Sequence, residues 1–262
     1  MADNEKKKYY FEQHILELSR RADEGNYPVF TDFLTTGEQT AVCRLKQKIK
    51  KNTGNISVVM WGGHDDCSHV VAGFLPDGYP DYDRASLFPV SCILIEPLDY
   101  RYAEQIGHRD YLGAVLALGT KRSKIGDIRI EDQKAYLFCK KEIASFIQEQ
   151  LSAVKHTIVS CQFVSDLDRI PKQKYDVAAR TVASLRLDNI VAAMAGISRG
   201  RASDLVSMGK VMVNSEEKTS VSFSCRDGFV ISIRGYGKYR LECPDNPLTK
   251  KGKHKIQIYK YI

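Results

Sequence analysis

Residues 185–214 constrain the fold of this chain most, because their pattern predicts two short helices followed by a strand. The first helix is indicated by apolar residues at i, i+3, i+4 and i+7: Leu187, Ile190, Val191 and Met194. Gly196 predicts its end, since glycine readily adopts the left-handed conformation found after a helix. Ser198 is a suitable N-cap for a second helix, which Gly209 ends. Its apolar stripe consists of Ala202, Leu205 and Val206.

Two arginines, Arg199 and Arg201, fall in the first turn of this second predicted helix. Positive charge there opposes the helix dipole, at a cost of about 0.3–1 kcal/mol for each residue. The surrounding sequence offers no visible compensation, and such a local conflict points to a function. A bound phosphate would compensate, because free backbone N–H groups and two guanidinium groups converge on one place. The alternative interpretation is a helical hairpin whose arginines are solvated.

The positive charge of the chain is concentrated in its last third. Residues 172–262 hold 17 Lys and Arg against 8 Asp and Glu, a net charge of +9, whereas the whole chain carries +7. Residues 1–171 therefore carry −2 and are not expected to drive binding to nucleic acid. A basic segment on a neutral-to-acidic body is typical of a nucleic-acid-binding module with something attached. The run 250–255 extends this basic segment, and the alternation over 256–261 predicts a closing strand.

Composition and cysteine spacing limit the class of protein. The chain has room for two or three small domains or one large one, and its hydrophobic and charged content is that of an ordinary globular protein. No secretory leader is recognised at the start, and no apolar run approaches the roughly 20 residues that span a bilayer. The seven cysteines are scattered and form no CxxC pair, so neither a disulfide framework nor a zinc ribbon is indicated. We expect a reduced, cytoplasmic protein that does not contact membranes.

We predict an α+β protein with three parts: an N-terminal α+β unit at 1–80, a middle unit at 81–171 and a C-terminal unit at 172–262. The boundaries follow Pro76 to Pro80 and Pro171 to Lys174. In the N-terminal unit the periodicity predicts helices over 5–24 and 37–51, with Thr36 as a possible cap, and a strand over 56–61.

The middle unit has the order β-α-β-β-α-β, which is typical of the ferredoxin-like plait. RNA-recognition motifs are one class of domain with this fold. Its predicted elements are strands at 90–96, 126–130, 134–139 and 156–164, and helices at 108–118 and 140–151. Tyr136 and Phe138 alternate onto one face of the third strand, where they could stack on bases or belong to the core. The loop 121–124 could contact a phosphate backbone or be simply solvated.

The ordered pattern of 185–214 resembles the S4 RNA-binding domain (αL type), with a match over about residues 180–240. That family pairs a helix beginning Arg186-Leu187-Asp188 with a helix beginning Ser198-Arg199, followed by a strand ending Val213-Asn214. The resemblance implies that arginines and a lysine contact phosphates, while Asn214 hydrogen-bonds a base edge or a 2′-hydroxyl. The implied RNA-binding residues are Arg180, Arg186, Arg199, Arg201, Lys210, Asn214 and Arg234. The acidic hairpin tip, Ser215-Glu216-Glu217, departs from an RNA-binding surface and is left out.

Taken together, the three units resemble the bacterial YlmH family of ribosome-associated proteins over nearly the whole chain. The segments that carry this resemblance are Gly126-Asp127-Ile128, Ser198-Arg199, Arg234-Gly235-Tyr236-Gly237-Lys238 and Leu248-Thr249-Lys250-Lys251-Gly252. The resemblance implies a non-enzymatic RNA-binding protein on the ribosome. Its expected ligands are rRNA and possibly tRNA at the large subunit, in translation quality control or rescue of stalled ribosomes. No cofactor, metal or small-molecule substrate is implied.

Two other classes of function stay open. One is an RNA-modifying enzyme whose catalytic domain within 1–171 is not recognised; the other is a cell-division-associated interaction protein. Arg186-Leu187-Asp188 resembles the catalytic triplet of pseudouridine synthases, but it lies on a helix stripe, which favours a structural or capping role for Asp188.

The densest group of possible metal-binding or catalytic side chains comprises His64, Asp65, Asp66, Cys67 and His69. Its spacing fits no structural zinc pattern, so we interpret it as a polar loop. No methyltransferase-type glycine turn and no Walker-type phosphate loop is present.

Overall fold

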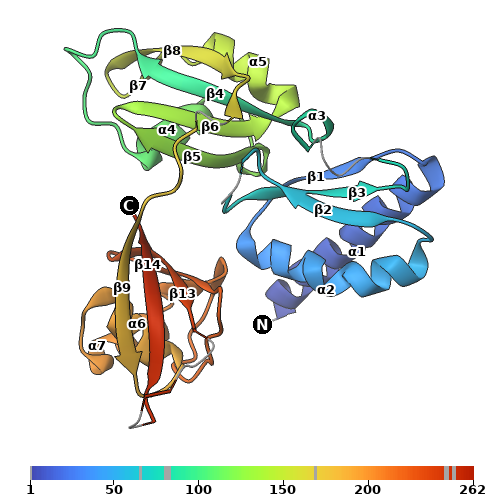
Figure 1. Cartoon of the computed structure of the whole chain (residues 1–262). Helices are drawn as coiled ribbons and strands as arrows, with labels where there is room; N and C mark the ends of the chain where they lie inside the picture. Colours follow the sequence, from blue (N-terminus) through green and yellow to red (C-terminus); the bar gives the residue numbers. More distant parts are fainter. Residues whose placement is uncertain (1, 65–66, 80–83, 168–169, 245–247, 250–251) are drawn as a thin grey trace. The chain divides into compact units, whose positions relative to one another are not determined.

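The computed structural model describes residues 2–64, 67–79, 84–167, 170–244, 248–249 and 252–262 (Figure 1). The chain divides into two compact units, Met1–Lys172 and Gln173–Ile262. The further division near residue 80 stays a prediction, and Pro80 lies outside the described residues. Within the described ranges, no helix has the length and apolar character needed to cross a membrane.

The compact unit Met1–Lys172 is called the N-terminal unit from here on. It begins with two helices on a three-stranded antiparallel sheet. Helices α1 (Ala2–Gly25) and α2 (Thr36–Asn52) pack on strands in the order β1 (Val29–Leu34), β3 (Val70–Leu75), β2 (Ser57–Trp61). The two predicted helices and the strand at β2 are confirmed, whereas β1 and β3 were not predicted.

The N-cap of α2 is Thr35, so the prediction of Thr36 was wrong by one residue. The Thr35 hydroxyl accepts from the Glu38 N–H, and the Glu38 carboxylate accepts from the Thr35 N–H at 2.8 Å. This reciprocal pair requires an acidic residue three positions after the cap, and Glu38 stands at that distance from Thr35.

A five-stranded antiparallel sheet with helices follows in the same unit. The chain runs through α3 (Arg84–Leu87), β4 (Val90–Pro97), α4 (His108–Ala117), a 3₁₀ turn η1 (Arg122–Lys124), β5 (Ile125–Glu131), β6 (Lys134–Lys140), α5 (Lys141–Gln150), β7 (Ala153–Val154) and β8 (Thr157–Val164). The spatial order is β5-β6-β4-β8-β7. All six predicted elements of this segment are present in the predicted order. Helices α4 and α5 contribute, with the sheet, to one core that contains Ile93, Tyr111, Leu137 and Ile147.

Aromatic side chains fill the space between the two sheets of this unit. Phe138 is fully buried there with Phe33 and Phe88, while Tyr136 is half-buried at the edge of the same cluster. Phe138 is therefore a core residue, and of the two interpretations of this residue the base-stacking one was wrong. Nearby, the buried Lys140 ammonium donates to the Thr31 carbonyl at 2.7 Å, and burial lowers the pKa of Lys140 to about 8.

The C-terminal unit is a six-stranded antiparallel sheet with helices α6 (Leu187–Ala195) and α7 (Arg199–Ser207). The strand order is β11 (Glu216–Glu217), β10 (Val211–Val213), β12 (Val230–Ile233), β13 (Gly237–Glu242), β14 (His254–Tyr261) and β9 (Tyr175–Val182). The closing strand is confirmed as β14. It pairs along its whole length with β9, which was not predicted. One core joins the helices to alternate residues of these strands.

Candidate nucleic-acid interface

The turn between α6 and α7 has the predicted local structure. Leu187, Ile190, Val191 and Met194 are buried on one face of α6. Gly196 ends that helix in the left-handed conformation at φ 66°. The Ser198 hydroxyl accepts from the Arg201 N–H at 3.3 Å and caps α7, and Gly209 follows α7 with φ 68°. The amides of Arg199 and Gly200 have no acceptor within the helix, because a first turn never provides one.

One of the two positive charges in the α7 first turn, that of Arg199, is compensated from within the chain. The Asp188 carboxylate is 2% exposed; its Oδ2 accepts from Arg199 Nε at 2.8 Å and its Oδ1 from Arg186 Nε at 3.3 Å. The expectation of an uncompensated charge was therefore wrong for Arg199, whereas no described ion pair involves the side chain of Arg201. The preceding helix supplies the counter-charge eleven residues earlier in the chain. Asp188 is a structural carboxylate, as its position on the helix stripe indicated.

Burial alone would raise the pKa of Asp188. The hydrogen bonds from Arg199, Arg186 and the Asn189 N–H outweigh it, so the pKa lies below its usual value. The carboxylate is thus ionised at neutral pH and holds both guanidinium groups through their Nε atoms. The side chains of Arg186 and Arg199 are still 41% and 56% exposed. Because a guanidinium has five N–H donors, each arginine retains donors for an external anion.

Three further predicted residues present exposed cations. Arg234 lies in the β12–β13 turn and donates its N–H to the Lys210 carbonyl at 2.9 Å, which places these two residues side by side in the backbone. Arg201 is exposed in the first turn of α7. Among the residues that the structure describes, no ion pair involves the side chains of Arg201, Lys210 or Arg234.

Arg180 and Asn214 have different environments. Arg180 is exposed on the edge strand β9 and pairs in register with Ile256, so it shares the sheet face that carries the helices. Asn214 lies in the tight turn between β10 and β11 at φ 49°, where its Oδ1 accepts from the Val230 N–H at 2.9 Å. The side-chain oxygen of Asn214 therefore contributes to the turn, while its amide nitrogen has no described acceptor and can donate to a ligand. The hydrogen bond from Asn214 to a base edge or a 2′-hydroxyl stays a prediction.

The edges of the predicted surface are only partly described. Glu216 and Glu217 are exposed in β11, and the Lys218 ammonium lies 2.7 Å from Glu216, so this hairpin carries little positive charge. Lys250 and Lys251, which the sequence adds to the basic segment, lie outside the described residues.

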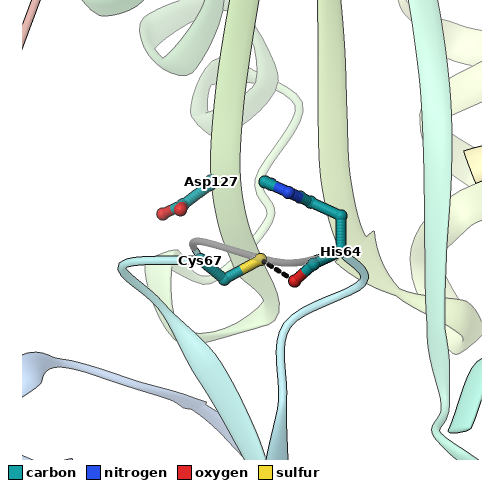
Figure 2. A group of neighbouring side chains, drawn as sticks. All are labelled: His64, Cys67 and Asp127. Atoms are coloured by element: carbon teal, nitrogen blue, oxygen red, sulfur yellow. Dashed lines mark hydrogen bonds between the residues drawn. The ribbon is translucent and has the colours of Figure 1, made fainter. Parts of the chain in front are cut away.

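The second group singled out by the sequence gathers around Asp127 of β5 (Figure 2). Ligand atoms of His64, Cys67 and Asp127 all lie within 4.8 Å of one another. Asp65 and Asp66 lie outside the described residues. Asp127 comes from a strand nearly 60 residues later. Asp127 belongs to the segment Gly126-Asp127-Ile128, and no local signal in the sequence connects it with His64.

The described partners of this group favour a structural role. Asp127 accepts from the Ser68 and His69 backbone N–H groups at 2.6 and 3.2 Å, and from His69 Nδ1 at 2.7 Å. Arg129 Nε donates to His64 Nε2 at 3.2 Å, and another guanidinium nitrogen of Arg129 lies 3.8 Å from Asp127. This buried arginine opposes a cation at the same place. The arrangement fastens the loop after β2 to the edge of the second sheet.

Comparisons with known proteins connect this chain with one family. Residues 96–167 match the family described as “Putative RNA-binding domain in YlmH”. The matched segment is the middle one, which the charge balance had not marked as the main RNA contact. A solved structure, “Cell division protein ylmH from Streptococcus pneumoniae”, has a TM-score of 0.52 and 15% identity. The match covers 63% of this chain and 95% of the solved chain.

A similar sequence extends over nearly the whole chain. The “Ribosome-associated protein quality control protein P2” of Bacillus subtilis (strain 168) is 30% identical over 257 residues, which is 94% of this chain and 92% of the relative. Identity of this extent shows common ancestry along the full length, including the basic C-terminal unit. The chain belongs to the YlmH family.

Proposed function

We propose that this chain is a non-enzymatic, cytoplasmic RNA-binding protein that associates with the ribosome and takes part in translation quality control. The relative from B. subtilis is named for that process, and the family description of residues 96–167 names RNA as the ligand. The expected binding site is on the large subunit, where rRNA and tRNA would be contacted together.

Under this proposal the C-terminal unit is an S4 domain and residues 81–171 form a ferredoxin-like plait. The plait assignment is supported by two features: the strand order β5-β6-β4-β8 and the packing of α4 and α5 into one core with the sheet. The S4 assignment is supported by the capped α6–α7 pair that leads into β10.

The observation that carries the RNA-binding proposal is the geometry around Asp188. A buried carboxylate orients Arg186 and Arg199 and still leaves both partly exposed. Arg201 lies in the same first turn of α7 as Arg199. Guanidinium groups held in place lose less side-chain entropy on binding, and their paired N–H donors match phosphate oxygens. Lys210 and Arg234 would extend the phosphate contacts beyond the C-terminal end of α7, and Arg180 would flank them.

Co-sedimentation with ribosomal subunits across a salt series tests the proposal. Arg199→Ala is a poor test because it would leave the buried Asp188 without its shortest ion pair. The triple variant Arg201→Ala/Lys210→Ala/Arg234→Ala removes exposed cations and no described ion pair. A matched control is Lys46→Ala/Lys48→Ala/Lys50→Ala on the exposed side of α2.

We expect salt-sensitive migration of the wild type and the control with the large subunit, and its loss in the triple variant. If the wild type migrates with no subunit even at low salt, the ribosome proposal is wrong. If the triple variant migrates like the wild type, the assignment of the surface is wrong.

A further inference from the structure

One face of the C-terminal sheet carries no helix within the described residues. The core of this unit contains Tyr239, Leu241, Ile256 and Ile258, which point to α6 and α7. Because neighbours along a strand point to opposite faces, the residues between them form the other face. We call this the outer face. Its members on β13, β14 and β9 are Lys238, Arg240, Glu242, Lys255, Gln257, Tyr259, Tyr261, Tyr175, Val177, Ala179 and Thr181.

Two cations on β13 lie over tyrosine rings of β14 and β9 on the outer face. Arg240 pairs in register with Tyr259, and its guanidinium lies 4.7 Å from the centre of the Tyr259 ring and 5.1 Å from that of Tyr175. The Lys238 ammonium lies 4.6 Å from the centre of the Tyr261 ring. Tyr175 joins the two rows, since its ring centre is 5.7 Å from Tyr259 and 5.1 Å from Tyr261. The result is a connected patch of three rings and two cations.

Cross-strand aromatic pairs also stabilise sheets, so the patch could serve folding alone. The charge of the patch favours a role in binding as well. Lys238 and Arg240 project from the same face two residues apart on one strand. Glu242, 2.9 Å from Arg240, is the one acidic partner that the described ion pairs give this patch. In addition, Arg240 Nε is buried and has no hydrogen-bond acceptor within the described chain.

Polar groups for the edge of a base lie beside the rings. Arg240 and Gln257 line an open hollow of about 340 Å³ together with Asp227 and Glu242. The Asp227 carboxylate already accepts from the Cys243 N–H at 2.6 Å, which leaves acceptor capacity on the same group. Guanidinium, amide and carboxylate groups are the donors and acceptors that pair with base edges.

We propose that the outer face is a second RNA-binding surface, which binds unpaired nucleotides by stacking their bases on Tyr175, Tyr259, Tyr261 and the Arg240 guanidinium. This inference rests on the proposed function for the identity of the ligand, but it uses the opposite face of the sheet and different chemistry. Aromatic rings and arginine planes stack on unpaired bases of any sequence. Guanidinium and ammonium groups already held over the rings are arranged for this before RNA arrives.

The test compares two RNA probes on the full chain by fluorescence anisotropy: a 12-nucleotide oligouridylate and a 12-base-pair duplex. The variant Tyr259→Leu/Tyr261→Leu removes the rings but no charge, and Tyr259→Phe/Tyr261→Phe keeps the rings. The control is Tyr9→Leu/Tyr10→Leu, which removes an exposed tyrosine pair from α1, in the other unit.

We expect the leucine variant to bind oligouridylate about 5- to 150-fold more weakly, the range for one to a few kilocalories of stacking. The dependence of its affinity on salt should be unchanged because no cation is lost. The phenylalanine variant, the control and all duplex affinities should stay within about twofold of the wild type. Unchanged oligouridylate binding by the folded leucine variant would overturn the proposal, as would an equal loss for the duplex.

A measurement on the wild type keeps the proposal testable if the leucine variant fails to fold. Oligouridylate that contains 4-thiouridine is cross-linked and the sites are mapped by mass spectrometry. Cross-links at Tyr175, Tyr259 or Tyr261 support the proposal, and cross-links confined to α6 and α7 contradict it.

The two proposals fail separately. If the wild type migrates with ribosomes and the leucine variant binds oligouridylate normally, the outer-face inference is wrong and the ribosomal function stands. If the tyrosines determine oligouridylate binding but the wild type migrates with no subunit, the ribosomal function is wrong and the outer-face inference stands.

Discussion

The Asp188 carboxylate lies 2.8 Å from Nε of Arg199, and this ion pair joins the first turn of α6 to the first turn of α7. It compensates the charge of Arg199, one of the two arginines that oppose the helix dipole in the first turn of α7. Because Arg186 shares the same carboxylate at 3.3 Å, one buried charge orients both arginines. A structural ion pair and a phosphate-binding surface are therefore compatible here: Nε of each arginine serves the first, and the exposed guanidinium nitrogens remain for the second.

Asp188→Asn should destabilise the C-terminal unit by about 1–3 kcal/mol, since a neutral amide replaces the ionised acceptor of two arginine hydrogen bonds. Hydrogen exchange of the amides over 187–207 measures the effect. Asp204→Asn, at an exposed position on α7, is the control and should change exchange little. Equal protection in both variants would show that the Asp188 pairs are energetically unimportant.

Removing the cap and the stop signal between α6 and α7 should have separate effects. Ser198→Ala should cost about 1 kcal/mol because the Arg201 N–H loses its acceptor, and Ser198→Thr should restore most of it. Gly196→Ala should cost about 1 kcal/mol through backbone strain alone, since an added Cβ meets no atom within 4 Å. Chemical denaturation of each variant measures both values; a neutral Gly196→Ala would contradict the strain argument.

Acid should loosen the N-terminal unit through Asp127. Burial opposes ionisation of this carboxyl, but His69, the Ser68 N–H and Arg129 outweigh it and lower the pKa to about 2. The pKa in the unfolded chain is about 3.9, so the folded form binds the proton more weakly. The ionised carboxylate therefore contributes about 2 kcal/mol above roughly pH 4, and this is lost as the pH falls toward 2.

Fluorescence of Trp61, the single tryptophan, monitors unfolding of this unit across that pH range. Asp127→Asn should lower stability at neutral pH and flatten the dependence between pH 4 and pH 2. Asp132→Asn, in the exposed β5–β6 turn, should leave both unchanged. A wild-type curve that is flat over this range would contradict the role of Asp127.

Gly63→Ala should destabilise the junction of the two sheets by more than 1 kcal/mol. The glycine has φ 112°, and an added Cβ would collide with the buried ring of Phe138. Thermal unfolding followed at Trp61 compares this variant with Gly54→Ala, where an added Cβ meets nothing within 4 Å. If the two variants melt together, Phe138 is less tightly covered than its burial indicates.

The salt dependence of RNA binding counts phosphate contacts. With about five phosphates neutralised, the logarithm of affinity should fall with the logarithm of salt concentration at a slope of roughly −4. Arg201→Ala/Lys210→Ala/Arg234→Ala should reduce the steepness by about 0.7–0.9 for each lost contact. Titrations of a ribosomal RNA fragment at four or more salt concentrations measure the slope, with Lys46→Ala/Lys48→Ala/Lys50→Ala as the equal-charge control. Equal slopes for both triple variants would remove these residues from the interface.

Local patterns were sufficient wherever neighbours in sequence decide the structure. The stripe of α6, the left-handed Gly196, the Ser198 cap and the six elements between residues 90 and 164 depend on periodicity and on short-range hydrogen bonds, and they were predicted correctly. The strands β1, β3 and β9 were missed because their neighbours in the sheets stabilise them more than their own residues indicate.

The site depended on contacts between distant residues. Arg199 is an uncompensated charge in the sequence and half of an ion pair in the fold, because the turn at Gly196 brings Asp188 to it. Asp127 reaches the loop after β2 across nearly 60 residues, and Tyr175 meets Tyr259 and Tyr261 only through pairing of β9 with β14. Spacing along a chain describes one helix or strand at a time. The partner of a charge or a ring depends on how several helices and strands pack together, so only the folded chain could identify that partner.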